Sequence, residues 1–379
     1  MSYLTRLKLK LIGEINAIPQ FLQGNYFTEL AGLRGIAIIL VLLYHLGINH
    51  FLRRYNCWIL GRLGVDIFFV LSGFLITTIL LKEKVRTQHI SLRKFYIRRA
   101  LRIMPVAYLY LIVIFINNYI FHLNIDYKSF ISGFLNLKNL PISGINDTFT
   151  EHFWSLSVEE QFYLFFPLLL VISINKTTLI ASLSVLGILI FSLLGYHQIG
   201  LLCQFRPLTL VCKFFMFLFW EGPFTLFIGS LFAILSFKNV INFVQFKHKS
   251  FLSLILFILA IAFHSNTFYF YTQYLSEFIF DCLIGCIIIL SIGSRSLFSK
   301  LLNAKWLIWI GTISYSIYIW QQLINLIPLY WVDHHLFGFS HDALFVLVDL
   351  GRLIAILALA SFSYYFIERR FLKLKAHFE

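Results

Sequence analysis

Charged residues are scarce in this sequence. Asp, Glu, Lys and Arg make up 13% of the 379 residues, whereas a soluble domain carries about a quarter. Long polar regions are also lacking, which excludes a second, soluble domain. Hydrophobic residues make up 59% of the chain, and Phe alone contributes 43. Apolar stretches long enough to cross a bilayer recur along the whole length, a pattern typical of a polytopic α-helical membrane protein.

The sequence also lacks an internal repeat, a low-complexity tract and the cysteine spacing of zinc or haem sites. Its cysteines are too dispersed for a disulfide framework: Cys57, Cys203, Cys212, Cys282 and Cys286. The first 25 residues lack the apolar core and small-residue cleavage site of a signal peptide. We interpret them as a basic N-terminal segment at the membrane interface.

The apolar runs predict an all-α fold with about ten transmembrane helices. We expect residues 1–27 to form a cytoplasmic or interfacial segment, residues 28–370 the membrane domain and residues 371–379 a cytoplasmic tail. The expected spans are 28–48, 60–81, 103–121, 153–174, 178–196, 216–237, 251–268, 276–293, 306–328 and 344–367.

The formal net charge of +14 follows the positive-inside rule. With the N-terminus in the cytoplasm, 22 of the 31 Lys and Arg residues fall on the cytoplasmic side and seven on the outer side. This asymmetry predicts that both termini and the basic stretch 82–102 are cytoplasmic, whereas the long loop 122–152 lies outside. Nucleic acid is therefore not needed as a partner to explain the positive charge.

The first span, "GLRGIAIILVLLYH", contains Arg34 and His45. Eleven residues of helix bring the two side chains within about 20° of the same face, ~16 Å apart along the axis. Arg34 could snorkel to the headgroups and His45 could be a packing residue. An ionisable residue at depth favours a functional role, and we expect this face to line a cavity.

The fourth span opens "HFWSLSVEEQFYLFFP" and places Glu159 and Glu160 about two turns inside it. Ser155 lies one turn before Glu159 on the same face. Two adjacent carboxylates at this depth are costly unless they are paired or face water. A structural pair with arginines elsewhere is the alternative to a functional role.

The second span, "GRLGVDIFFVLSGFLIT", carries Asp66 near its outer end, followed by Ser72 and Gly73. Asp66 could orient His45, because a carboxylate commonly fixes the tautomer of an imidazole. At the cytoplasmic mouth of the third span, "IRRALRIMP" groups Arg98, Arg99 and Arg102. These arginines are either a topology anchor or a clamp for phosphates.

The outer loop "WVDHHLFGFSHD", 331–342, concentrates three His and two Asp. These residues could bind a metal, but their spacing matches no recognised metal motif, so we favour a solvated loop.

Five motifs together resemble a known family. "ELAGLRGIAIILVLLYH", "GVDIFFVLSGFLIT", "IRRALRIMP", "HFWSLSVEEQFYL" and "ISYSIYIW" stand in the order and spacing of the acyltransferase 3 family of bacterial membrane O-acyltransferases, which includes O-antigen and peptidoglycan O-acetylases. The resemblance spans residues 29 to about 370.

This resemblance implies a ten-helix enzyme of the bacterial inner membrane that takes acyl groups, usually acetyl, from cytoplasmic acyl-CoA. The acyl-CoA is a co-substrate, and no permanently bound cofactor is implied. The acceptor would be a hydroxyl of a surface carbohydrate or its lipid-linked precursor, such as lipopolysaccharide O-antigen. Some members carry an additional extracytoplasmic domain, and we expect this chain to be the membrane module alone.

The family's functional motifs fall on Arg34 and His45, on Arg98, Arg99 and Arg102, and on Trp154, Ser155, Glu159 and Glu160. With Asp66 added from its own position, we expect the catalytic group to be His45, Arg34, Glu159, Glu160 and Asp66, and the donor to bind at Arg98, Arg99 and Arg102. Acceptor binding or support of the site would fall to Trp154, Ser155, Ser72 and Tyr315. The sequence departs from the family at Gln321, where many members have His, and at Arg370, where proline is common.

Acyl transfer from a thioester to a hydroxyl needs a base and positive charge for the developing oxyanion. His45 is the candidate base because imidazole titrates near neutral pH, and Arg34 could hold the donor or stabilise charge. One rival interpretation is a transporter or flippase for a glycan or lipid-linked sugar, although the inverted repeats of such proteins are not evident. Another is an inactive assembly partner.

Overall fold

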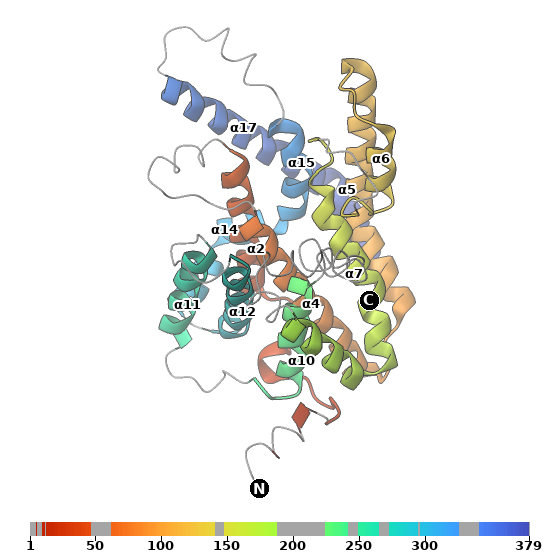
Figure 1. Ribbon diagram of the computed structural model, residues 1–379, viewed down its shortest axis with the longest axis vertical. Helices are drawn as coiled ribbons and strands as arrows, with labels where there is room; N and C mark the ends of the chain where they lie inside the picture. The colour runs from red at the N-terminus through yellow and green to blue at the C-terminus, as the bar shows by residue number, and fades with distance from the viewer. Residues whose placement is uncertain are drawn as a thin grey trace, which may run out of the picture. The chain divides into compact units, whose positions relative to one another are not determined.

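The computed structural model describes residues 5, 10–11, 13–46, 62–140, 148–187, 224–241, 249–264, 273–294, 296–325 and 341–378. Within these residues the chain is helical and has no strand (Figure 1). The all-α prediction is therefore confirmed for this part of the chain. The chain divides into two compact units, which are described separately below. Unit 1 contains residues 1–34, 65–90 and 162–309, and unit 2 contains residues 35–64, 91–161 and 310–379.

Five helices are long and apolar enough to cross a membrane, judged by length and composition among the described residues. They are α2 (Thr28–His45), α4 (Arg62–Thr87), α5 (Leu92–Phe121), α7 (Phe153–Ile172) and the C-terminal stretch Leu347–Lys375. Each overlaps a span expected from the sequence. The total of ten spans and the cytoplasmic placement of both termini stay predictions.

The basic stretch 82–102 is mostly helical. Helix α4 continues to Thr87 and α5 begins at Leu92, so only a short turn separates them. In that turn Gln88 adopts a positive φ of 64°. The sequence-based spans stopped at residue 81 and restarted at residue 103, because that estimate followed hydropathy. Charged side chains are good helix formers, so a helix can continue past the apolar region.

The expected span 306–328 is divided into α14 (Lys305–Thr312) and α15 (Ser314–Asn325). The break falls at Ile313, whose carbonyl accepts the first helical bond of α15 from the Ile317 amide at 3.0 Å. Gly311, Thr312, Ile313 and Ser314 all favour a helix less than Ala or Leu does. Hydropathy alone gives no sign of this break.

Unit 1 contains α10 (Phe224–Phe237), α11 (Lys249–His264), α12 (Gln273–Ser291) and the short α13 (Leu297–Leu302). Helix α11 packs against both α12 and α13. Close backbone contact joins α4 to α10, because a Cβ on Gly73 would overlap the Leu226 carbonyl. The Ser230 hydroxyl donates to the Gly73 carbonyl at 3.2 Å across the same contact. Small residues thus allow these two apolar helices to approach closely.

Lys238 follows α10 and holds the N-terminal segment in unit 1. Its ammonium donates to the carbonyls of Leu11 and Gly13, at 2.6 and 3.0 Å, and to Asn175 Oδ1 at 2.7 Å. Burial lowers the pKa of Lys238, because desolvation disfavours the charged form. The three oxygen acceptors offset that cost.

Unit 2 is built around α5 and α15. Helix α5 packs against α6 (Tyr127–Phe134), α15, the turn η4 (Tyr364–Glu368) and α18 (Arg369–Lys375), and α15 also packs against α17 (His341–Ser363) (Figure 1). The helix α6 begins at Asp126, whose side chain accepts from the Lys128 amide, a typical N-cap. Tyr108 stacks on Phe134 and fixes α6 on α5.

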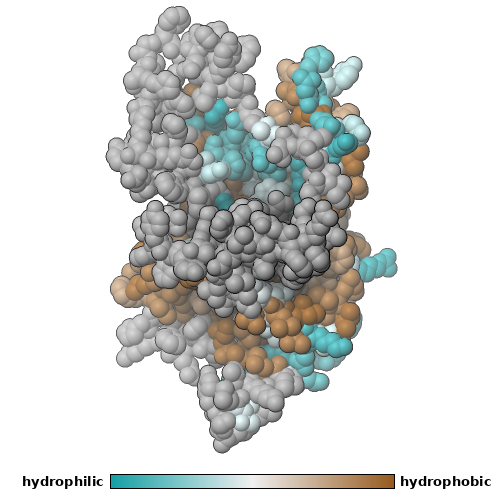
Figure 2. Space-filling model, in the orientation of Figure 1, coloured by the Kyte–Doolittle hydropathy of each residue, from teal (hydrophilic) through white to brown (hydrophobic). Residues whose placement is uncertain are grey.

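Hydrophobic side chains are exposed on the flanks of α5 and α7 (Figure 2). Among them, Phe115 is 60% exposed, Phe165 is 62% exposed and Ile172 is 71% exposed. Such faces are unusual on a protein surrounded by water and are expected where lipid is the solvent.

Candidate functional site

Arg34 and His45 are both carried by the continuous helix α2, and both are half-buried. Because the helix is unbroken between them, their eleven-residue separation places the two side chains on nearly the same face, ~16 Å apart along the axis, as predicted from the sequence. Arg34 belongs to unit 1 and His45 to unit 2. Of the other predicted residues, Asp66 and Ser72 belong to unit 1, and all the remaining ones belong to unit 2. Asp66 as the orienting group of His45 stays a prediction.

The ring of His45 is held by its own helix. Nδ1 lies 2.8 Å from the Val41 carbonyl oxygen. Because a carbonyl can only accept a hydrogen bond, Nδ1 carries the proton, and in the neutral ring the lone pair is on Nε2. Glu151 lies close enough to interact electrostatically with His45. Nε2 is therefore the ring nitrogen that can accept a proton. Burial of the ring disfavours its charged form, and the Glu151 carboxylate partly offsets this.

Ser155, in the first turn of α7, contacts Tyr318 of α15. Their hydroxyl oxygens are 2.5 Å apart, and both hydroxyls also lie within bonding distance of the His152 carbonyl oxygen, at 3.2 Å for Ser155 and 3.1 Å for Tyr318. The His152 ring packs edge-on against both Tyr110 and Tyr318. These contacts tie the start of α7 to α5 and α15.

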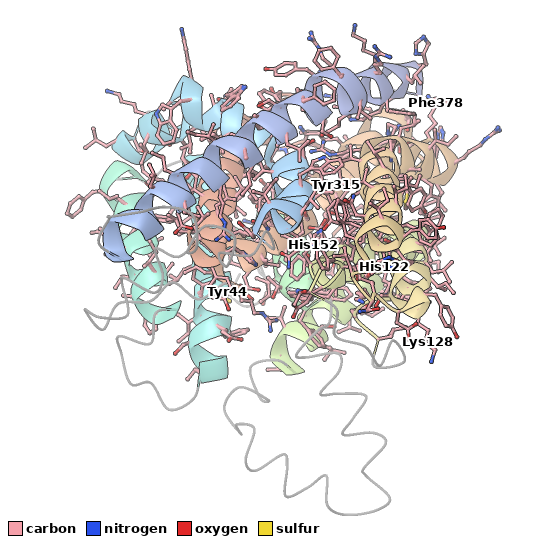
Figure 3. The ribbon with its side chains drawn as sticks, turned by 90° about the horizontal axis from the view of Figure 1, so that it is seen from above. Tyr44, His122, Lys128, His152, Tyr315 and Phe378 are labelled. Atoms are coloured by element: carbon pink, nitrogen blue, oxygen red, sulfur yellow. The ribbon has the colours of Figure 1, made fainter. Side chains whose placement is uncertain are left out.

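Tyr315 lies one turn before Tyr318 on α15 and faces α5. Its hydroxyl donates to the Ile103 carbonyl at 2.6 Å. The charged groups that interact electrostatically with it are Glu368, Glu160, Glu159 and Arg102. Figure 3 shows Tyr315 and His152 on the side of α15 that faces α5. The predicted residues Tyr315, Glu159, Glu160 and Arg102 therefore form one cluster, which we call the α15 cluster.

Within the α15 cluster, Glu160 interacts electrostatically with Arg99 as well as with its neighbour Glu159. Its Oε1 is buried and has no hydrogen-bond partner among the described residues. The proximity of Arg99 agrees with the structural alternative raised for the two carboxylates, a pair with an arginine of another helix. Paired charges of this kind are also typical of substrate paths in membranes.

Glu368 extends the α15 cluster from the C-terminal part of the chain. It is 2% exposed and accepts a hydrogen bond from the Ser316 hydroxyl at 2.8 Å. It lies in η4, a π-helical turn between α17 and α18. Single π-turns within helices occur frequently at functional sites.

The three predicted donor-binding arginines have different neighbours. The Arg98 guanidinium donates to the Phe378 carbonyl at 2.8 Å, near the C-terminus, Arg99 interacts with Glu160 and Arg102 with Tyr315. All three are half-buried. Their role as a phosphate clamp stays a prediction. Trp154, also half-buried, lies in the first turn of α7 beside Ser155.

Several residues of this site were not singled out from the sequence. His152 opens the "HFWSLSVEEQFYL" motif and Tyr318 lies within "ISYSIYIW", but neither was assigned a role, and Glu151 directly precedes the first of these motifs. Their contacts depend on which turn of α7 faces which turn of α15, and one-dimensional spacing does not supply that. The histidine-rich loop 331–342 lies largely outside the described residues, so the expectation about a metal site there stays a prediction.

The arrangement in unit 2 combines a histidine with a proton-accepting nitrogen, two half-buried tyrosines with hydrogen-bonded hydroxyls, carboxylates and arginines. Such a set can abstract a proton from a hydroxyl group and can stabilise negative charge. Membrane-embedded enzymes of group transfer need both capacities.

Comparison with known proteins agrees with this class. The model of a family described as an acyltransferase domain matches residues 27–367, and the chain belongs to that family. The resemblance noted from the five motifs is thereby confirmed.

Two curated relatives are similar over most of this chain. The peptidoglycan O-acetyltransferase OatA of Listeria monocytogenes is 32% identical over 325 residues, which cover 79% of this chain and 49% of the relative. The O-acetyltransferase OatA of Staphylococcus aureus is 30% identical, covering 94% of this chain and 58% of the relative. This chain thus spans about half of the length of these proteins. No solved structure gives a significant match.

Proposed function

We propose that this chain is a membrane O-acetyltransferase, which moves an acetyl group from cytoplasmic acetyl-CoA to a hydroxyl of a cell-surface carbohydrate. The family match across residues 27–367 carries this proposal. One relative is named for peptidoglycan, so a cell-wall glycan is the first acceptor to test. Lipopolysaccharide O-antigen, suggested by the motif resemblance, is the second.

His45 supplies the base in this proposal. Its Nδ1–H is bonded to the Val41 carbonyl, so Nε2 takes the proton of the acceptor hydroxyl as the oxygen attacks the acetyl carbon. When the carbon–sulfur bond of the thioester breaks, the imidazolium returns this proton to the sulfur, and CoA leaves as the thiol. Glu151 stabilises the resulting imidazolium. Arg34, on the same face of α2 and nearer the expected cytoplasmic end, holds the donor or stabilises the oxyanion.

The α15 cluster forms the donor side of the site in this proposal. Arg99 and Arg102 are half-buried beside Glu160 and Tyr315, and guanidinium groups recognise phosphates by paired hydrogen bonds. Arginine at the expected cytoplasmic end of α5 would meet the negatively charged phosphates of CoA as it enters from the cytoplasm.

The test is acetyl transfer by the purified full chain in lipid nanodiscs. Acetyl-CoA labelled in the acetyl group is supplied with either soluble glycan strands of peptidoglycan or isolated O-antigen, and the products are analysed by mass spectrometry. We expect one acceptor to gain acetyl groups in proportion to the CoA released. CoA release without label on any glycan would contradict the carbohydrate acceptor, and binding of glycan without CoA release would favour a transporter.

A further inference from the structure

The outer end of α15 carries an unusual group of uncharged polar side chains. Gln321 is 0% exposed, and neither its amide nitrogen nor its amide oxygen has a hydrogen-bond partner among the described residues. The same is true of both amide atoms of Asn325, of the Gln322 amide oxygen and of the Trp320 indole nitrogen. We call these four residues the amide group.

An unpaired buried amide is costly, because its hydrogen bonds to water are lost on folding and not replaced. Leu or Met would fill the same volume without this cost. Here three neighbouring amide side chains and an indole N–H each have at least one buried polar atom without a partner among the described residues, all at one end of one helix. Their retention indicates a polar ligand that satisfies them, as buried polar groups in proteins are generally paired.

The orientation of these residues connects them with the site. Gln321 and Asn325 are one helical turn apart, and Tyr318 lies nearly on the same face, because multiples of 100° bring positions 318, 321 and 325 within about 60° of one another. Tyr318 contacts Ser155, and Glu151 interacts electrostatically with both Tyr318 and His45. Gln321 and Asn325 therefore continue the face of α15 on which Tyr318 lies, whereas Trp320 points about 140° away from Asn325.

Neighbouring contacts hold the amide group in place. The Gln322 amide nitrogen donates to the Thr148 carbonyl at 2.5 Å, and the Trp320 ring packs edge-on against Tyr110, with ring centres 5.5 Å apart. The Tyr110 hydroxyl in turn donates to the Phe149 carbonyl at 2.7 Å. Residues 148–149 belong to the loop expected on the outer side, the side on which a surface acceptor would enter.

We propose that the amide group is the acceptor subsite and that it binds a neutral sugar through its hydroxyl and acetamido groups. This inference rests on the proposed function and specifies its acceptor side. Each amide offers both donors and an acceptor, which suits sugar hydroxyls that do both. The group itself carries no charge, and Glu151 interacts electrostatically with Tyr318, one turn before Gln321, so an anionic sugar is disfavoured.

The variants for the test are Gln321→Met and Asn325→Leu, which keep the side-chain volume and remove the amide. Thr78→Val is the matched control, because the Thr78 hydroxyl in α4 is also buried without a partner among the described residues. Removing an unsatisfied polar group should leave the thermal stability of all three variants unchanged or raised. Protein that accumulates normally is then compared with wild type.

The measurement has two arms. In the first, binding of a neutral N-acetylglucosamine tetramer and of a galacturonic acid tetramer is followed by calorimetry without acetyl-CoA. In the second, the KM for the glycan acceptor and the KM for acetyl-CoA are determined. We expect wild type to prefer the neutral sugar, and Gln321→Met and Asn325→Leu to raise the acceptor KM about five- to tenfold each, the effect of one lost hydrogen bond. The KM for acetyl-CoA and the Thr78→Val protein should not change.

The two proposals fail in different ways. A wild-type protein that transfers no acetyl group to any glycan, yet binds the neutral tetramer through the amides, would contradict the function and leave the subsite standing. A wild-type enzyme that transfers acetyl while Gln321→Met and Asn325→Leu keep its acceptor KM would overturn the subsite alone. Absence of both transfer and tetramer binding would overturn both.

Discussion

The His45 ring offers the sharpest test of the chemistry, because two amide side chains can imitate its two nitrogens separately. Asn places its nitrogen near the position of Nδ1 and can keep the hydrogen bond to the Val41 carbonyl, which is 2.8 Å long in the native protein. Gln reaches nearer the position of Nε2 and loses that bond. Neither side chain takes up a proton near neutral pH.

The two possible roles of His45 predict effects of different size. If the ring only braces α2 through Val41, losing that bond costs about 1 kcal/mol, or roughly a fivefold effect at most on the population of competent protein, and His45→Asn should behave as wild type. If His45 is the base, both variants lose proton transfer, which contributes about 10²–10⁴-fold. That loss corresponds to about 2.7–5.4 kcal/mol of barrier. The effects are far enough apart to decide between the roles.

The assay is single-turnover acetyl transfer at saturating acetyl-CoA, beside quantified protein in the membrane and its thermal stability. We expect His45→Asn and His45→Gln to lose activity about equally, by at least roughly 100-fold, while acetyl-CoA affinity and accumulation stay near wild type. A well-folded His45→Asn protein with near wild-type transfer would refute the assignment of His45 as the base.

Three further outcomes follow from the structure. Arg102→Lys keeps the charge but loses the planar guanidinium, so calorimetry should show acetyl-CoA affinity lower by roughly five- to tenfold, with normal membrane insertion. An unchanged affinity would mean that Arg102 serves only as a topology anchor. Gly73→Ala should lower the stability by about 1–3 kcal/mol in thermal unfolding, because its Cβ would overlap the Leu226 carbonyl, whereas Gly351→Ala, with no atom within 4 Å of the added Cβ, should be neutral or stabilising. Lys128→Cys, in a background without native cysteines, should react with a membrane-impermeant maleimide added outside intact cells; labelling only after lysis would contradict the predicted topology.

Much of the helical framework could be predicted because hydropathy and helix period are local properties. The candidate spans α2, α4, α5 and α7 each begin or end close to the limits set by the sequence, and the five motifs indicated the family. The predicted span boundaries were wrong where a helix continues on charged residues, as α4 does to Thr87. They were also wrong where a helix breaks within an apolar run, as at Ile313.

The candidate site could be predicted only in part for a related reason. Spacing places Ser155 and Glu159 on one face of α7, but the partner of Ser155 is Tyr318, 163 residues away. The pairing of Glu368 with Ser316 likewise joins distant positions. Such contacts depend on the rotation of one helix against another, which side-chain packing determines and residue order does not reveal.

The π-helical turn at Tyr364–Glu368 makes the count of residues in this segment as important as their identity. A π-turn holds one residue more than an α-turn, so every later side chain is rotated by about 100° from the phase that α17 alone would set. That rotation brings Glu368 to Ser316 and sets the face that α18 presents to α5. Deleting a single residue here would change the charge and hydropathy of the chain very little, yet it would turn the buried carboxylate and the final helix away from their partners. A substitution scan tests only residue identity and would not reveal this dependence on length.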